Sequence, residues 1–176
     1  MKVFYVFGFR YSLKIWHLSG ALEREIMYFE KLYKNYNIQH SLFTYGDFDE
    51  LNYLNNKNIT IYPMFSLFKN TDSKFITFLL SLVYPFKIRK NLKNNIDIIK
   101  VNQLSGAWVG IILSLILKKP LYIRTGYDQY LFSIQDGKNV FKRVFFYLLT
   151  QLSLIFSDIY SVTSKSDFEF ITKKFQ

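Results

Sequence analysis

Short, almost wholly apolar segments recur along this chain and alternate with longer segments that have helical periodicity. The apolar segments are rich in β-branched and aromatic residues, which is typical of strands buried on both faces of a parallel sheet. They are Val3–Phe7, Ser41–Tyr45, Ile59–Tyr62, Ile96–Val101, Leu121–Ile123 and Ile159–Val162. Strands of this kind need helices on both sides, so the pattern restricts the chain to the α/β class.

The intervening segments supply those helices. Within Ala21–Tyr36 the apolar residues recur as they do on one face of a helix. These are Leu22, Ile26, Phe29 and Tyr33. We expect Ser105 to cap a second helix that runs to Lys118-Lys119, and Pro120 to end it and open the next strand. Phe141–Phe156 and Asp167–Lys174 are the remaining predicted helices. The sequence predicts a doubly wound, mainly parallel, Rossmann-like sheet with helices on both faces, as a single domain over residues 1–176.

Composition excludes several classes of function. The 176 residues include no cysteine, so the chain has no disulfide framework, no thiolate nucleophile and no cysteine zinc site. The only histidines, His17 and His40, are too far apart in sequence to suggest a metal site. The formal net charge of +10 accompanies an excess of residues with A/T-rich codons, so it favours an anionic partner only weakly. The basic residues are scattered and no stacking motif accompanies them, so nucleic-acid binding is not predicted.

Three uncharged windows are candidates for membrane spans, and all are too short. A span needs about 20 predominantly apolar residues. The longest continuous apolar stretch, Ala107–Leu117, does not reach this length. The first residues are interrupted by Arg10 and Lys14 and lack a cleavage site, so they are interpreted as an interior strand and not as a signal peptide. We therefore expect a cytoplasmic protein, and peripheral contact with an anionic membrane at its inner face stays open.

Polar residues follow the predicted strands. In open parallel sheets, ligands bind beyond the carboxyl ends of the strands. The residues at those ends are Gly8, Arg10, Gly46, Asp47, Asn102, Gln103, Arg124–Asp128 and Thr163–Lys165. The sequence thus predicts a polar cleft along one edge of the sheet.

The first loop, Gly8–Gly20, is long and lacks Gly-x-Gly-x-x-Gly, and the chain has no P-loop motif, so dinucleotide and P-loop functions are disfavoured. The loop ends in Ser19-Gly20 at the start of a helix, where a glycine lets a phosphate or sugar hydroxyl approach free N–H groups. The alternative is that Ser19 or Gly20 only caps the helix. His17 is a binding candidate or a surface residue of the same loop.

A second cluster, Arg124-Thr125-Gly126-Tyr127-Asp128, follows a strand directly. Arg124 offers a planar cation for phosphate or carboxylate, and Asp128 could accept a hydroxyl proton or orient a sugar. The alternative is an internal Arg124–Asp128 pair that stabilises a turn at Gly126. Asp47-Phe48-Asp49 has the Asp-x-Asp spacing of some metal-dependent sugar transferases, but it is interpreted mainly as a solvated loop, and no metal is predicted.

The order and spacing of four segments resemble the N-terminal domain of family 4-like glycosyltransferases with the GT-B fold. Ser19–Glu25 is similar to that family's Gly-x-x-Glu-Arg helix start. The other segments are Asp97–Lys119, Lys119–Asp128 and Asp158–Lys165. The sequence departs from the family at Arg124, because the loop after Ile123 usually carries a histidine followed by Asp or Gly.

The resemblance implies transfer of a sugar from a nucleotide diphosphate donor to a glycan or lipid-linked acceptor in cell-surface polysaccharide synthesis. It implies retention of configuration, no metal, and no cofactor beyond the nucleotide-sugar co-substrate. Asp128 and Arg124 would be catalytic, and Gly20 would approach the diphosphate. The remaining substrate-binding candidates are His17, Ser19, Gln103, Gly126 and Tyr127.

In the GT-B fold a second domain grips most of the donor, and that domain would begin near Lys173–Gln176. The chain therefore corresponds to the acceptor half and is expected to be inactive alone. Two alternatives stay open. The first is a non-catalytic α/β subunit that completes a separately encoded donor-binding chain. The second, which the strand order disfavours, is a metal-dependent transferase that uses Asp47 and Asp49.

Overall fold

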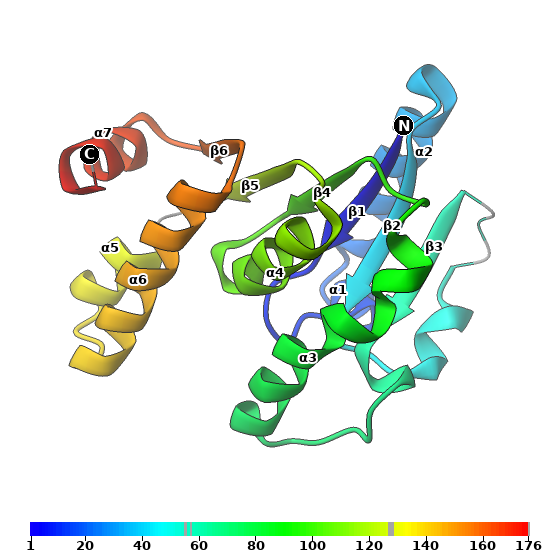
Figure 1. Cartoon of the computed structure of the whole chain (residues 1–176), viewed down its shortest axis with the longest axis horizontal. Helices are drawn as coiled ribbons and strands as arrows, with labels where there is room; N and C mark the ends of the chain where they lie inside the picture. Colours follow the sequence, from blue (N-terminus) through cyan, green and yellow to red (C-terminus); the bar gives the residue numbers. More distant parts are fainter. Residues whose placement is uncertain (55, 57, 127–128, 176) are drawn as a thin grey trace.

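A computed structural model describes residues 1–54, 56, 58–126 and 129–175 (Figure 1). Six strands form one sheet in the order β3-β2-β1-β4-β5-β6. Every neighbouring pair is parallel. The order reverses direction between β1 and β4, which is the Rossmann arrangement. The doubly wound, Rossmann-like α/β fold predicted from the sequence is confirmed.

The strands lie close to their predicted positions. They are β1 (Lys2–Val6), β2 (Gln39–Thr44), β3 (Ile59–Pro63), β4 (Ile98–Val101), β5 (Leu121–Thr125) and β6 (Ile159–Val162). β4 begins later than expected, at Ile98, and the Asp97 side chain just before it accepts a hydrogen bond from the Lys2 backbone N–H at 2.7 Å. β5 extends two residues beyond Ile123, so Arg124 belongs to the strand itself.

Seven α-helices lie in the described ranges. They are α1 (Leu13–Leu18), α2 (Leu22–Tyr36), α3 (Lys74–Leu92), α4 (Ala107–Leu117), α5 (Gln129–Gln135), α6 (Val140–Phe156) and α7 (Lys165–Phe175). Short 3-10 helices span Phe48–Asn52 (η1), Met64–Ser66 (η2) and Leu104–Gly106 (η3). α1 lies inside the segment that was predicted to be a long loop, and α3 and α5 were not predicted. Within the described ranges, no helix combines the length and apolar character that a membrane span requires.

The expected cap at Ser105 is wrong. α4 begins at Ala107 after η3, and its N-cap is Gly106, which has no side chain to accept a hydrogen bond. The Ser105 hydroxyl instead accepts a hydrogen bond from the Phe9 N–H at 3.3 Å, which ties the loop after β1 to the loop after β4. At its other end α4 stops at Lys118, whose left-handed backbone (φ 53°) closes the helix before Pro120 and β5.

The two faces of the sheet are packed by different helices. Tyr5 of β1 and Phe7, which directly follows β1, pack with residues of α1 and α2. Phe4 and Val6, whose side chains point the other way because side chains alternate along a strand, pack with α3 and α4. The Trp108 indole N–H of α4 donates to the Ser81 hydroxyl of α3 at 2.9 Å, which joins the two helices on that second face.

The coverage of the α2 side is incomplete. α1 and α2 pack on β1 and β2, while α4 and α6 lie on the opposite side of β4 and β5 (Figure 1). On the α2 side, Lys100 of β4 and Tyr122 of β5 are half-buried and Arg124 is exposed. Ile159 of β6 is 56% exposed. Among the described residues, one half of this sheet face is therefore incompletely covered, and the candidate site lies at the border of the covered half.

Candidate functional site

The loops after β1 and β4 meet at the switch point of the sheet. The α-carbon of Gly8 lies against the Gln103 side-chain oxygen, and that of Gly106 lies against the Phe7 carbonyl. A Cβ at either glycine would collide with these atoms. The Phe9 N–H also donates to the Ser105 carbonyl at 3.1 Å. The predicted binding residue Gln103 thus sits at the switch point, where it packs between the two loops.

His17, Ser19 and Gly20 lie at the junction of α1 and α2 and are exposed. The Ser19 hydroxyl donates to the Trp16 carbonyl of α1 at 3.1 Å. Gly20 has a φ of +70°, a conformation that favours glycine, and open space beyond its α-carbon. Neither residue caps α2, whose N-cap is Ala21 with no side-chain hydrogen bond. The turn is therefore accessible to a ligand.

Charge at this turn is mixed. The imidazole of His17 lies 3.7 Å from the Glu23 carboxylate, and its ring lies 5.5 Å from that of Tyr53. Glu23 and Glu25 both lie in the first turn of α2, where acidic side chains stabilise the helix. The same carboxylates oppose an anion at this helix end, so the dipole alone does not make it a phosphate site.

A cavity of about 450 Å³ opens between the first turns of α2 and the side chains of β4 and β5. We call it the α2 groove. Its lining residues are Arg24, Glu25, Tyr28, Lys100, Tyr122 and Arg124. Of the residues predicted from the sequence, it contains Arg124, and it begins four residues after Gly20 in the chain. The groove is the candidate binding site.

Lys100 forms the floor of the α2 groove. Its ammonium lies 5.4 Å from the centre of the Tyr5 ring and 5.6 Å from that of Tyr122, within the range of cation–π contacts. Partial burial lowers the pKa of Lys100, and the nearby positive charge of Arg124 lowers it further, while Glu25 acts in the opposite sense. The floor therefore holds a cation among aromatic rings and beside another cation.

Sequence reasoning identified Arg124 but missed Lys100 and Tyr122. The signal for Lys100 was a lysine in the middle of an otherwise apolar strand. Its meaning depends on register, because Tyr5 pairs with Lys100 and Lys100 pairs with Tyr122 across three neighbouring strands. Tyr28 and Arg24 were assigned only to the helix, since their side of α2 could not be placed against β5 without the strand order.

Gly126 lies at the carboxyl end of β5. Its carbonyl accepts a hydrogen bond from the Thr163 hydroxyl at 2.5 Å, which links the ends of β5 and β6. Space beyond its α-carbon is open. The other two members of the predicted cluster, Tyr127 and Asp128, lie outside the described residues.

The carboxylates of Asp47 and Glu50, in the acidic segment Asp47–Glu50, accept hydrogen bonds from neighbouring parts of the chain. The Asp47 carboxylate accepts a hydrogen bond from the Asp49 N–H at 3.2 Å and caps η1. Glu50 is 2% exposed, in contrast to the solvated loop predicted there. Its carboxylate accepts from the Thr44 hydroxyl and, at 3.3 Å, from the Lys14 N–H at the start of α1. In the part of the chain that the structure describes, no group of His, Cys, Asp and Glu residues could hold a metal ion.

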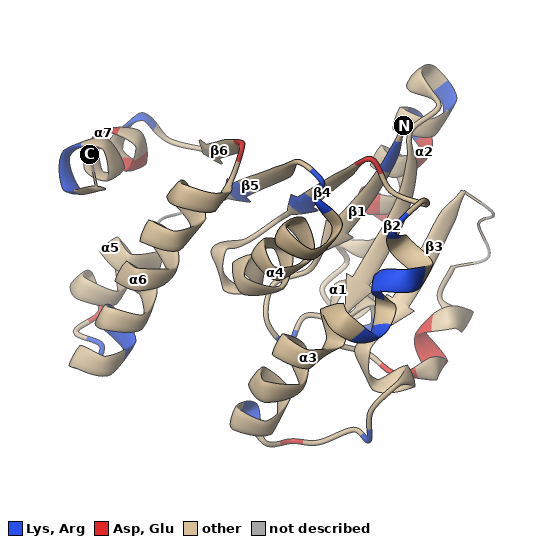
Figure 2. Cartoon of the chain, in the orientation of Figure 1, with Lys and Arg blue, Asp and Glu red and all other residues tan. Residues whose placement is uncertain are grey.

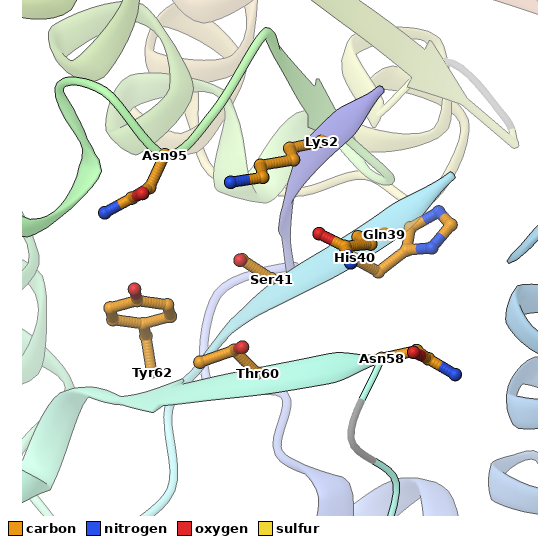
Figure 3. A pocket seen from close by; sticks show the side chains of 8 residues that line it. All are labelled: Lys2, Gln39, His40, Ser41, Asn58, Thr60, Tyr62 and Asn95. Atoms are coloured by element: carbon orange, nitrogen blue, oxygen red, sulfur yellow. The ribbon is translucent and has the colours of Figure 1, made fainter. Parts of the chain in front are cut away.

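A separate cavity of about 240 Å³ lies toward the amino ends of β1, β2 and β3 (Figure 3). Hydroxyl and amide side chains dominate its lining, which is Lys2, Gln39, His40, Ser41, Asn58, Thr60, Tyr62 and Asn95. The His40 ring points away from Ser41 and Tyr62 and lies 4.3 Å from the Phe29 ring. Burial and the charge of Lys100 lower the pKa of His40 to about 4, so it is neutral at pH 7. This cavity contains no sequence-predicted residue.

No model of a known protein family matches the chain. No curated protein sequence matches it either.

Proposed function

We propose that these residues form the acceptor-binding half of a glycosyltransferase that moves a sugar from a nucleotide diphosphate donor to a glycan or lipid-linked acceptor in cell-surface polysaccharide synthesis. One observation carries the proposal. Two of the segments that resemble such enzymes, Ser19–Glu25 and Lys119–Asp128, are far apart in sequence, yet Arg24, Glu25 and Arg124 line one cavity.

The groove supports acceptor binding by its chemistry. Arg124 is exposed at the carboxyl half of β5, and its guanidinium matches a phosphate or carboxylate of an acceptor. Tyr28 and Tyr122 supply ring faces against which a sugar or an apolar group can pack. The open turn at Gly20 lies at the end of α2 nearest the groove, where only a diphosphate that other residues already hold would approach.

The donor is held elsewhere in this proposal. The chain has no Gly-x-Gly-x-x-Gly loop that could hold a nucleotide. The first turn of α2 also carries two glutamates, whose negative charge opposes independent binding of the donor diphosphate there. Residues outside this domain, in the same polypeptide or in a partner subunit, would grip the nucleotide and meet the charge that develops on the leaving diphosphate. Asp128 as the residue that orients the acceptor hydroxyl stays a prediction, as do retention and independence of metal.

A cytoplasmic location at the inner face of the membrane is part of the proposal. α3 and α6 expose large apolar side chains, among them Phe75, Phe86, Phe141 and Ile155. Neither helix contains an aspartate or glutamate, while together they hold six lysines and arginines (Figure 2). An apolar surface flanked by cations suits an anionic lipid surface, where a lipid-linked acceptor would reside.

The test is a kinetic comparison on the native protein, isolated from its own cells with every associated chain. Arg124→Met removes the guanidinium, and charge-assisted hydrogen bonds contribute about 1.5–3 kcal/mol. We expect KM for the acceptor to rise by about tenfold or more and KM for the nucleotide sugar to stay within about twofold. Lys31→Met, which removes an exposed cation of α2 outside the groove, is the control and should change neither. A selective rise in the donor KM would overturn the assignment of this half to the acceptor.

A further inference from the structure

The α2 groove continues into a second cavity. This neighbour has a volume of about 210 Å³ and shares Tyr28, Lys100 and Tyr122 with the groove. Its remaining lining is almost wholly apolar, namely Met1, Val3, Leu32, Ile38 and Ile98, together with the neutral His40. The two cavities therefore adjoin along α2, one with a charged lining and one with an apolar lining, and both are lined by Lys100; we call the pair the channel.

Strand register explains this division. Val3 pairs with Ile98, and two residues further along Tyr5 pairs with Lys100, so apolar side chains precede the lysine on the same face. Arg124 lies two residues beyond Tyr122 on β5 and continues the row toward the carboxyl edge. The polarity of the channel thus runs with the strands, from Val3 and Ile98 at the amino ends to Arg124 at the carboxyl edge.

The charged end has an excess of positive charge. Arg24, Lys100 and Arg124 stand against the single carboxylate of Glu25, which leaves two positive charges in excess. Arg24 is paired with Glu25 at 3.0 Å. Among the described residues, neither Lys100 nor Arg124 has a carboxylate within ion-pair distance. Two neighbouring cations repel each other, Glu25 offsets only part of this positive charge, and a bound dianion would reduce the repulsion further.

The cavity sizes limit the ligand. A space of about 450 Å³ joined to one of about 210 Å³ is in the range of small-molecule sites. The head of the ligand must carry about two negative charges and accept hydrogen bonds, which a phosphate monoester does at neutral pH. The other part must be apolar enough to displace water from Val3, Leu32 and Ile98.

We propose that this channel binds an amphiphile that carries a phosphate group, with the phosphate between Lys100 and Arg124 and the apolar part along Val3 and Ile98. The inference rests on the proposed function, because it names the chemical class of the acceptor. The phosphate could belong to a membrane lipid or to a soluble alkyl phosphate, since both present the same head and an alkyl chain.

Binding is measured without a nucleotide sugar, so that it does not depend on catalysis. The native protein is titrated by calorimetry with decyl phosphate below its micelle concentration, with inorganic phosphate and with the neutral amphiphile octyl glucoside. We expect decyl phosphate to bind at least tenfold more tightly than either comparison ligand, because it alone engages both ends of the channel. Equal affinity for decyl phosphate and octyl glucoside would overturn the proposal.

Two variants separate the ends of the channel. Lys100→Met keeps the length of the side chain and should weaken decyl phosphate at least tenfold, whereas the control Lys31→Met, on the exposed side of α2, should not. Ile98→Thr keeps a β-branched strand residue and should weaken decyl phosphate while leaving inorganic phosphate unchanged. Unfolding temperatures verify that each variant is folded. If Lys100→Met binds like Lys31→Met, the phosphate does not lie at Lys100 and the proposal is wrong.

A competition experiment with lipid vesicles distinguishes a membrane lipid from a soluble alkyl phosphate as the source of the phosphate. Vesicles that contain phosphatidic acid should compete with decyl phosphate if a membrane lipid can enter the channel, and phosphatidylcholine vesicles should not. Binding to the former without any binding of decyl phosphate would overturn the channel in favour of simple surface attachment. Decyl phosphate binding without sugar transfer from any donor would refute the acceptor role and the proposed function together. Transfer without decyl phosphate binding would refute this inference alone.

Discussion

Lys100 is a lysine within a strand whose other three residues are apolar, and its surroundings are unusual for a cation. Its ammonium lies between the rings of Tyr5 and Tyr122 and beside Arg124, and it has no carboxylate partner among the described residues. Burial and the positive charge of Arg124 lower its pKa. A half-buried cation without an ion pair costs folding free energy, and the phosphate-binding role proposed above would account for its position.

The stability of the Lys100→Met variant tests whether Lys100 has a structural role. A depressed pKa means that the charged lysine costs folding free energy at every pH below that pKa, and that the cost is relieved as the pH rises from there to the ordinary pKa of lysine. Replacing a poorly paired, half-buried cation by an apolar residue of similar length is neutral or stabilising. We expect the unfolding temperature of Lys100→Met at pH 7 to equal or exceed that of wild type, with the difference shrinking toward pH 10. A drop of more than about 4 °C would assign Lys100 to the core.

Glu50 is the second titratable residue with unusual surroundings. Burial raises the pKa of its carboxyl group, and the hydrogen bonds from Thr44 and from the backbone N–H groups at the start of α1 partly offset this. For an acid with a raised pKa, the stability that the protonated group supplies is present at low pH and is lost as the pH rises through the folded-state pKa. Through its hydrogen bond with the Lys14 N–H, Glu50 anchors the start of α1, the helix that leads to Gly20.

Glu50→Gln should therefore change the pH dependence of stability. The amide oxygen can still accept the Lys14 N–H, and the variant has no charge to bury. We expect its unfolding temperature, relative to wild type, to improve steadily from pH 4 to pH 7. The control Asp49→Asn removes an exposed carboxylate of the same 3-10 helix and should show no such trend. A constant difference across this range would mean that Glu50 does not titrate as described.

At the scale of elements, the loops after β1 and β4 are held together by close backbone packing. Gly106 lies against the Phe7 carbonyl, and Phe9 donates to Ser105. Gly106→Ala would force a Cβ into the Phe7 carbonyl, an overpacking that costs about 1–3 kcal/mol. We predict a fall of several degrees in the unfolding temperature, measured by circular dichroism, against a change of under about 2 °C for Gly126→Ala, which has open space. Similar shifts in both variants would contradict the close approach.

The strands and the fold were predictable from the sequence because their signal is local. Each strand is a short apolar run between turns, and α2 shows a single stripe in which Leu22 and Phe29 are buried. α3 was missed because it is apolar on several sides and contains Pro85, so it lacks a clear helical period. α1 was missed because six residues inside a long connection carry little periodicity. Elements with a one-sided pattern are predictable, and elements apolar all round are not.

The site was less predictable than the fold for a physical reason. Arg124 was identified because it follows a strand, which is a local cue. Tyr122 shares the face of Arg124 because side chains alternate along β5, but Lys100 lies beside them only through the pairing of β4 with β5, and no local pattern specifies that pairing. The alternative in which Ser19 or Gly20 only caps α2 is wrong, because Ser19 bonds back to α1 and the N-cap of α2 is Ala21. Contacts between distant segments are what the sequence alone does not provide.

At the scale of the whole molecule, apolar and basic side chains gather on α3 and α6, which touch through the Phe78 and Phe145 rings at 6.2 Å. Phe141 is 86% exposed and Val144 is 50% exposed. If this surface meets an anionic membrane, the double variant Phe141→Gln with Val144→Gln should reduce co-sedimentation with phosphatidylglycerol vesicles at least fivefold. Phe48→Gln, an exposed phenylalanine of η1, is the control and should sediment as wild type does. Equal sedimentation of both variants would mean that α6 does not bind the membrane.

The proposed acceptor-binding role requires that the protein take part in sugar transfer. The most direct measurement is a transfer assay on the native protein together with all chains that co-purify from its own cells. The donors are radiolabelled UDP-glucose, UDP-galactose, UDP-N-acetylglucosamine and GDP-mannose, and a membrane extract of the same cells supplies the acceptor. The account predicts that label from one of these donors enters a lipid or glycan product, and that Arg124→Met reduces this transfer at least tenfold while Lys31→Met does not. Absence of transfer from every donor, or transfer that is indifferent to Arg124, would contradict it.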